Sequence, residues 1–242
     1  MAFEYAPWPL PASVQAGWTT RRSGVSSAPF NGFNVAYHVG DAPSSVDINR
    51  ALLWQQLQQT PQIAWLNQTH STHVVQASHA STKEPSDASV TMQKGIACCV
   101  MTADCLPVFF WTKKGDQVAV AHAGWRGLAN GILLNTLQQF PNAADVVCGL
   151  GPCIGPTAFE VGSDVKRTFA DWPNSQNCFT ATEKPEKFLA DLPRLAEQQL
   201  RLLGVAHVYR SDICTVSYPT DYFSFRRDGE TGRMANLIWK ID

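Results

Sequence analysis

The segment from Thr102 to Gly127, TADCLPVFFWTKKGDQVAVAHAGWRG, constrains the fold of this chain more than any other stretch. It contains two apolar runs, Val108 to Trp111 and Val118 to Ala121, separated by a polar stretch with a glycine. Short runs of β-branched and aromatic residues on either side of such a loop are typical of a β-hairpin. The segment therefore predicts two antiparallel strands, with Cys105 and His122 at their outer ends.

The register of this hairpin decides whether Cys105 and His122 meet. A loop centred near Lys114 and Gly115 places His122 opposite Pro107. Because side chains alternate between the two faces of a strand, Cys105 and His122 then become diagonal neighbours with Cα atoms ~7–8 Å apart. A shift of one residue would put them on opposite faces. The thiol–imidazole pair is therefore a prediction for this register only.

A metal site needs at least a third ligand, and the chain has six histidines. His70, within NQTHSTHVV, lies among polar residues at the boundary of a strand-like run, where a side chain can face a cavity. His73 begins the following apolar run and can equally face outward. Two histidines and a cysteine with an open fourth position are typical of catalytic zinc, but spacing alone does not select the ligands. The other histidines are His38, His79 and His207.

Each of these residues also has a structural interpretation. A cysteine in a reduced chain is commonly a small core residue, although Cys105 has a charged neighbour that a core position does not need. Asp104 either orients a ligand or caps a turn. The glycines of HAGWRG form a tight turn into a helix or expose backbone amides to an anion. Arg226, Arg227 and Arg233 either solvate the C-terminal segment or bind a phosphate or carboxylate.

The cysteines indicate a reduced chain, because their number, seven, is odd and no CxxC motif occurs. Cys98, Cys99 and Cys148 lie inside apolar runs and are expected in the core. Cys105 and Cys153 differ from them, since each lies among Asp, Pro and Gly at the end of such a run.

The pattern of apolar runs predicts a mixed architecture. Continuous apolar runs at 96–101 and 146–150 indicate buried strands. Short strands and hairpins argue against a doubly wound parallel sheet. We therefore predict one α/β (α+β-like) domain over residues 1–242, with a mixed or antiparallel sheet and helices outside. Helices are expected at 46–59 (capped by Ser44-Ser45), 128–140, 163–170 and 192–203, a polar loop at 78–89, and a hairpin at 222–241.

Composition excludes several classes of function. The net charge is −1, so the chain has no basic field for nucleic acid. The first residues lack the positive segment of a secretory signal, and the longest apolar runs are too short to span a bilayer. We expect a cytoplasmic protein that binds neither nucleic acid nor membrane.

Taken together, the motifs resemble those of the YfiH/laccase-domain family, also called the multicopper polyphenol oxidase or DUF152 family. The resemblance covers nearly the whole chain, and TADC followed by HAGWRG is its most specific part. The motifs are TTRRSGVSSAPFNGFNVAYHVGD (19–41), NQTH (67–70), TADCLPV (102–108), HAGWRG (122–127), GPCIG (151–155), FEVG (159–162) and YFSFRRDGETGR (222–233).

The resemblance implies an α/β fold related to toxin-type cysteine hydrolases. It also implies a catalytic zinc bound by His70, Cys105 and His122. The implied activity is purine nucleoside phosphorolysis, in which adenosine, inosine or guanosine and phosphate give the base and ribose 1-phosphate. Adenosine deaminase and methylthioadenosine phosphorylase activities are associated with the same site, and zinc-activated water is a chemically sensible source of the former.

Three other interpretations stay open. Cys105 and His122 could act as nucleophile and base of an amide hydrolase, since a bacterial relative is linked to editing of cell-wall precursors. The chain could bind zinc or a partner without catalysis.

The third alternative is a laccase-like polyphenol oxidase with copper. Laccase chemistry needs a blue copper and a trinuclear copper cluster built mostly from imidazoles, which six histidines hardly supply. Copper could still occupy a single His–Cys–His site in place of zinc.

Overall fold

The hairpin predicted from the sequence is present, with the predicted register. Strands β7 (Leu106–Thr112) and β8 (Val118–Ala123) pair antiparallel, and Pro107 lies opposite His122. Cys105 lies just outside the ladder, in the turn that leads into β7. The hairpin therefore brings one end of β8 next to this turn.

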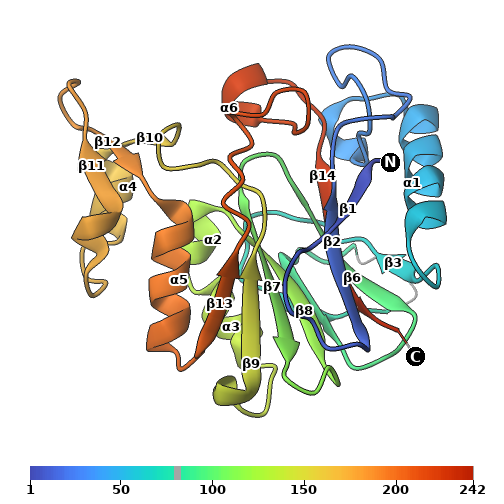
Figure 1. The fold of residues 1–242 in the computed structure, drawn as a ribbon. Coiled ribbons are helices and arrows are strands. Elements are labelled where there is room, and N and C mark those ends of the chain that lie inside the picture. Colours follow the sequence, from blue (N-terminus) through green and yellow to red (C-terminus); the bar gives the residue numbers. More distant parts are fainter. Residues whose placement is uncertain (79–82, 242) are drawn as a thin grey trace.

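The computed structural model describes residues 1–78 and 83–241, and the hairpin forms the centre of a six-stranded mixed sheet within them (Figure 1). The strand order is β13-β9-β7-β8-β5-β4, with parallel pairing at both margins and antiparallel pairing between. The added strands are β4 (Val74–Gln76), β5 (Ala88–Thr91), β9 (Val146–Leu150) and β13 (His207–Arg210).

A second sheet of five strands packs against the first. Its order is β1-β2-β14-β6-β3, so the last strand of the chain lies in the middle, between β2 and β6. The strands are β1 (Phe3–Tyr5), β2 (Val14–Thr19), β3 (Gln62–Ala64), β6 (Ile96–Thr102) and β14 (Met234–Lys240).

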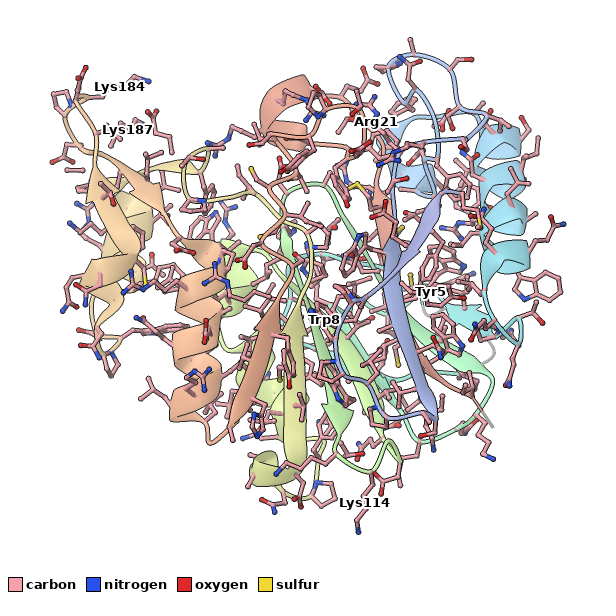
Figure 2. All side chains as sticks on the ribbon, in the orientation of Figure 1. Tyr5, Trp8, Arg21, Lys114, Lys184 and Lys187 are labelled. Carbon is pink, nitrogen blue, oxygen red and sulfur yellow. The ribbon has the colours of Figure 1, made fainter. Side chains whose placement is uncertain are left out.

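Aromatic side chains fill the space between the two sheets. Trp8, labelled in Figure 2, stacks on Trp111 with ring centroids 6.0 Å apart and contacts Phe109 edge-on at 5.2 Å. Such rings bury a large apolar area each and hold the sheets in fixed relation. These rings bury one face of the β7–β8 hairpin.

Helices cover the outer face of each sheet and complete four layers, helix–sheet–sheet–helix (Figure 1). Helix α1 (Pro43–Gln56) packs on the five-stranded sheet through Leu53. Helices α2 (Trp125–Ala129), α3 (Ile132–Leu137) and α5 (Leu192–Leu202) pack on the six-stranded sheet. Single turns of 3₁₀ helix occur at Tyr37–Val39, Ala143–Asp145 and Ser175–Cys178.

A small third sheet lies beside α5, on the side away from the five-stranded sheet (Figure 1). Its order is β10-β12-β11, all antiparallel, and α4 packs against it. The elements are β10 (Glu160–Gly162), α4 (Ser163–Thr168), β11 (Phe179–Ala181) and β12 (Lys187–Ala190).

Two helix predictions differ from the structure in their boundaries. The first helix begins at Pro43, with Ala42 rather than a serine as N-cap, because the fixed φ of proline suits the first helical position; it also ends at Gln56. The helix predicted over 128–140 is broken into α2 and α3, because Gly131 adopts a left-handed φ of 99°.

Two predictions near the strands were wrong. The C-terminal segment is not a hairpin: it forms the short helix α6 (Phe225–Asp228) and the single strand β14, whose partners come from distant parts of the chain. The polar stretch 78–89 is not all loop, because β5 begins at Ala88 and is fully buried. Residues 79–82 of that stretch lie outside the described residues.

The predicted fold class, mixed α/β with helices outside, is confirmed. No helix of the described residues is both long enough and apolar enough to cross a bilayer. The relation to toxin-type hydrolases and the assignment of residues 1–242 to one domain stay predictions.

Candidate active site and metal centre

Three side chains from separate segments converge at the end of the hairpin. His122 lies in β8, Cys105 in the turn between β6 and β7, and His70 in the loop between β3 and β4. One ligand atom from each lies within 4.8 Å of the other two, and Cys105 Sγ is 3.8 Å from His70 Nε2. The structure thus brings together the three residues expected from the sequence.

The backbone around these side chains has unusual φ angles and one very close approach. His70 and Asp104, the residue before Cys105, both have left-handed φ angles, of 60° and 90°. Gly124 lies so close that a Cβ there would be 3.0 Å from both Cys105 Sγ and His70 Cδ2. Non-glycine residues with such φ values are uncommon and cluster at functional sites. The first glycine of HAGWRG, Gly124, is therefore required because Cys105 and His70 approach its Cα so closely.

A buried carboxylate, Asp87, connects two of the three ligands. Its Oδ1 accepts hydrogen bonds from His122 Nδ1 at 2.7 Å and from the His70 amide at 3.1 Å. Its Oδ2 accepts from the Thr69 amide at 3.2 Å and from both the amide and the hydroxyl of Ser71, at 2.6 and 2.7 Å. Asp87 is fully buried, so it fixes both the imidazole of His122 and the loop that carries His70.

Electrostatics in the metal-free site favour a thiolate beside an imidazolium. Burial alone would raise the pKa of Cys105, but the charge and hydrogen bond of His122 and the hydrogen bond of His70 lower it to about 6. Burial likewise opposes charging of His122, but the Cys105 thiolate and Asp87 raise its pKa to about 9. A deprotonated Cys105 is the form that ligates a metal or attacks an electrophile.

Asp104 does not orient a ligand of the triad. Its carboxylate accepts hydrogen bonds from the Thr215 hydroxyl at 2.6 Å, the Ser224 hydroxyl at 3.0 Å and the Arg226 amide at 2.7 Å. Its carbonyl accepts from the Ile154 amide at 2.9 Å. Asp104 therefore joins the turn that carries Cys105 to the segments around 154, 215 and 224–226.

The triad opens into a cavity of about 530 Å³. Its lining includes apolar and aromatic side chains, cationic side chains, and the polar residues Gln68, Thr102 and Asp104. A cavity of this size and character suits a ligand as large as a nucleoside. The apolar and aromatic residues are Met101, Ala103, Trp125, Ile154, Phe159, Leu192 and Phe225, and the cationic or imidazole residues beyond the triad are His38, Arg126, Arg226 and Arg233.

The other residues considered from the sequence lie elsewhere. His73 and His207 are exposed and outside the ligand group, and His79 is outside the described residues. Cys153 is buried, and burial raises the pKa of its thiol well above the ordinary value. Arg227 donates to both carboxylate oxygens of Asp228, so it serves the local structure of α6.

The sequence did not point to Asp87. It lies in the stretch interpreted as loop, 35 positions from His122, and no local motif marks it. A buried strand directly after it, built of small residues, was the one signal that could have placed it.

The donor set fits a zinc ion. Tetrahedral zinc with Zn–N near 2.0 Å and Zn–S near 2.3 Å holds its ligand atoms roughly 3.5 Å apart, and Cys105 Sγ and His70 Nε2 are separated by 3.8 Å. With Nδ1 of His122 bonded to Asp87, Nε2 is the nitrogen available to a metal. Three protein ligands leave one coordination position open.

A multicopper centre is not supported by the described residues. Within 1–78 and 83–241, no second group of three or more His, Cys, Asp or Glu ligands occurs. A laccase needs a blue copper and a trinuclear cluster at separate sites. The single group therefore fits one metal ion.

Fold and site together define a mixed α/β protein with a His–Cys–His centre in a large cavity. A model of the family described as multi-copper polyphenol oxidoreductase laccase matches residues 15–241. The Pseudomonas aeruginosa protein named purine nucleoside phosphorylase is 43% identical over 237 residues, which cover 97% of each chain. Purine nucleoside phosphorylase YfiH of Escherichia coli is 41% identical over 238 residues, again 97% of each chain.

A solved structure gives the same result. The Neisseria meningitidis protein of family DUF152 superposes with a TM-score of 0.95 and 44% identity over the whole of both chains. The chain belongs to the YfiH/laccase-domain family.

Proposed function

We propose that this chain is a zinc-dependent purine nucleoside phosphorylase. Its substrates are adenosine, inosine or guanosine together with phosphate, and its products are the free base and ribose 1-phosphate. Adenosine deamination and methylthioadenosine phosphorolysis are proposed as further activities of the same site. Relatives at 41–43% identity that bear the name purine nucleoside phosphorylase support this assignment.

One observation carries the proposal: the His70–Cys105–His122 group opens directly into the 530 Å³ cavity. A metal held there would face the bound substrate through its open coordination position. When bound, zinc would supply a Lewis acid that withdraws charge from an oxygen or nitrogen of the reactants.

The side chains around the metal keep this site in one geometry. Asp87 binds Nδ1 of His122, which leaves Nε2 for a metal, and it holds the amide of His70 in its left-handed conformation. Cys105, with its pKa lowered to about 6, is deprotonated at neutral pH before any metal binds. Little rearrangement is then needed on metal binding, which is the condition for an efficient site.

The apolar part of the cavity suits the purine. Phe159 and Phe225 both line the cavity, and Phe225 is 59% exposed, so aromatic carbon is available there to contact a heterocycle. Aromatic faces bind heterocycles by stacking and exclude water from the reacting centre. In phosphorolysis, phosphate must attack C1′ as the bond from C1′ to the base breaks, so excluding water also limits competing hydrolysis.

A second candidate function is an amide hydrolase, and one observation favours it. Cys105, His122 and Asp87 form a chain of thiolate, imidazole and carboxylate, the arrangement that activates a nucleophilic cysteine. Editing of cell-wall precursors would belong to this class. Bound metal would occupy the thiolate, so the two functions exclude each other in one metal state.

The deciding experiment incubates zinc-loaded protein with inosine and inorganic phosphate and separates the products by chromatography. The phosphorylase predicts hypoxanthine and ribose 1-phosphate, both lost in Cys105→Ala. Release of an amino acid from a muramyl peptide by metal-free protein, without hypoxanthine from the zinc form, would favour the hydrolase. Oxygen uptake with a phenol after copper loading would instead support the laccase-like alternative.

A further inference from the structure

Three arginines line the cavity, and none of them has a carboxylate partner among the described residues. Arg126, Arg226 and Arg233 all border the space in front of the triad. The ion pairs found within 1–78 and 83–241 involve other cations. A guanidinium stays charged in proteins, and these three outnumber the two anionic groups of the lining, Asp104 and the Cys105 thiolate, so the cavity attracts an anionic ligand.

Two of these arginines are fixed through one nitrogen each. Nη1 of Arg233 donates to the carbonyls of Thr231 at 2.8 Å and Gly232 at 3.0 Å. Nη1 of Arg226 donates to the carbonyls of Glu160 at 2.9 Å and Ala158 at 3.4 Å.

The other two donor nitrogens of Arg226 and of Arg233, Nε and Nη2, lie side by side and form a fork that is free to bind a ligand. In the described part of the chain, Nε and Nη2 of both guanidinium groups lack a hydrogen-bond partner. Nε and Nη2 together form the planar pair that contacts two oxygens of a phosphate or carboxylate.

In the neighbouring Arg227, by contrast, the Nε–Nη2 fork is already occupied. Its Nε and Nη2 both donate to Asp228, and its Nη1 donates to the carbonyls of Thr215 and Val216. The unused forks are therefore not a general property of the arginines in this segment. They occur where the side chain borders the cavity.

Arg233 also lies within electrostatic reach of the reacting centre. Burial lowers its pKa, and the charges of Cys105 and Asp104 oppose that shift. Its ring contact, with the guanidinium carbon 5.9 Å from the centroid of Phe225, places it next to the aromatic part of the cavity. An anion held by Arg233 would thus lie near both the triad and the ring of Phe225.

We propose that Arg226 and Arg233 form the phosphate subsite of this cavity. Each presents its Nε–Nη2 fork to oxygens of an orthophosphate dianion, next to the carbon that the phosphate attacks. The inference rests on the proposed phosphorylase function, because phosphate is the second substrate of that reaction. It adds which side chains bind phosphate. Arg126 is given no such role, because its guanidinium stacks on Trp125 and no backbone carbonyl among the described residues holds it, whereas carbonyls hold Arg226 and Arg233.

Two arginine-to-glutamine variants test the subsite by direct binding. Zinc-loaded wild type, Arg226→Gln and Arg233→Gln are titrated with inorganic phosphate by calorimetry in the absence of nucleoside. Arg201→Gln is the matched control, since Arg201 pairs with Glu197 on the surface of α5. We expect each cavity variant to bind phosphate about tenfold or more weakly, the effect of one lost charged hydrogen-bonding partner, and the control to match wild type.

Kinetics separate this inference from the proposed function. In phosphorolysis of inosine, the KM for phosphate should rise about tenfold or more in both cavity variants, while the KM for inosine changes far less. Weaker phosphate binding in the variants of a protein that makes no hypoxanthine would leave the subsite standing and remove the phosphorylase. Hypoxanthine formation with an unchanged KM for phosphate in both variants would remove the subsite and leave the phosphorylase.

The test does not depend on every arginine variant folding normally. Arg226 is exposed on the short helix α6, so Arg226→Gln should fold even if the half-buried Arg233 proves sensitive. Arg233→Lys keeps the charge and loses the fork, so it should bind phosphate between wild type and Arg233→Gln. Equal phosphate binding by wild type, Arg226→Gln and Arg233→Lys would contradict the proposal.

Discussion

The carboxylate of Asp87 accepts a hydrogen bond of 2.7 Å from Nδ1 of His122, and both side chains are buried. This contact fixes which nitrogen of His122 can reach Cys105 or a metal. The same carboxylate holds the amides of Thr69, His70 and Ser71. One residue outside the ligand set therefore determines how two of the three ligands are placed.

Replacing Asp87 by asparagine should weaken zinc binding by about 10–100-fold. An amide can accept from His122 through its oxygen, but its NH₂ group would then face the amide and hydroxyl donors of Ser71. Competition with a chelating dye measures the zinc affinity. Asp171→Asn, at an exposed position, is the control and should bind zinc like wild type. Zinc affinity unchanged in Asp87→Asn would show that Asp87 does not position the site.

Cys105 should react with an alkylating agent at low pH in metal-free protein. Its pKa of about 6 predicts that alkylation by iodoacetamide reaches half its maximal rate near pH 6, rather than near the ordinary value of 9.0. Burial raises the pKa of Cys98, and that thiol should stay unmodified. Mass spectrometry of the peptide that contains residue 105 gives the rate, and zinc should protect it. A half-maximal rate above pH 8 would contradict the proposed thiolate.

Stability of the metal-free protein should depend on pH through the same pair. The folded pKa of Cys105 is lowered, so its contribution is complete above about pH 9 and is lost as the pH falls through 6. The folded pKa of His122 is raised, so its contribution is complete below about pH 6.5 and is lost as the pH rises through 9. The stabilising ion pair thus exists between pH 6 and 9. The Tm difference between wild type and Cys105→Ala should be largest there, and a difference independent of pH would argue against the pair.

Gly124→Ala should reduce metal binding without unfolding the chain. The new Cβ would lie 3.0 Å from Cys105 Sγ and His70 Cδ2, so one of these ligands must move. Gly127→Ala is the matched control, because its Cβ would meet nothing closer than 3.5 Å. We expect about a tenfold loss of zinc affinity for the first variant, comparable with other disturbances of ligand placement, and little change for the second. Equal affinities would show that the ligands tolerate this displacement.

The hairpin could be predicted from the sequence because its signals are local. Two apolar runs and a glycine-containing loop set the register that places Pro107 opposite His122, and the structure has this register. The C-terminal segment shows the limit of the same reasoning. Its loop resembles a hairpin turn, but β14 pairs with β2 and β6, which are more than 130 residues away in sequence, and no local pattern reveals those partners.

Some residues of the candidate site could likewise be predicted from local sequence, and others could not. Cys105 and His122 follow from the hairpin, and His70 from a motif, whereas Asp87 lies in a segment whose buried strand is built from alanine, serine, valine and threonine. Periodicity finds strands through large apolar residues and missed this one. The left-handed backbone of His70 is likewise a consequence of contacts with Asp87 that only the folded chain creates.

The most direct test of the account is the yield of hypoxanthine from inosine and phosphate by zinc-loaded wild type and by Cys105→Ala, with zinc per chain measured on the same samples. The account predicts one zinc per chain and steady hypoxanthine formation for wild type, and loss of both in the variant. Equal hypoxanthine formation by the variant, or none by fully zinc-loaded wild type, would contradict it.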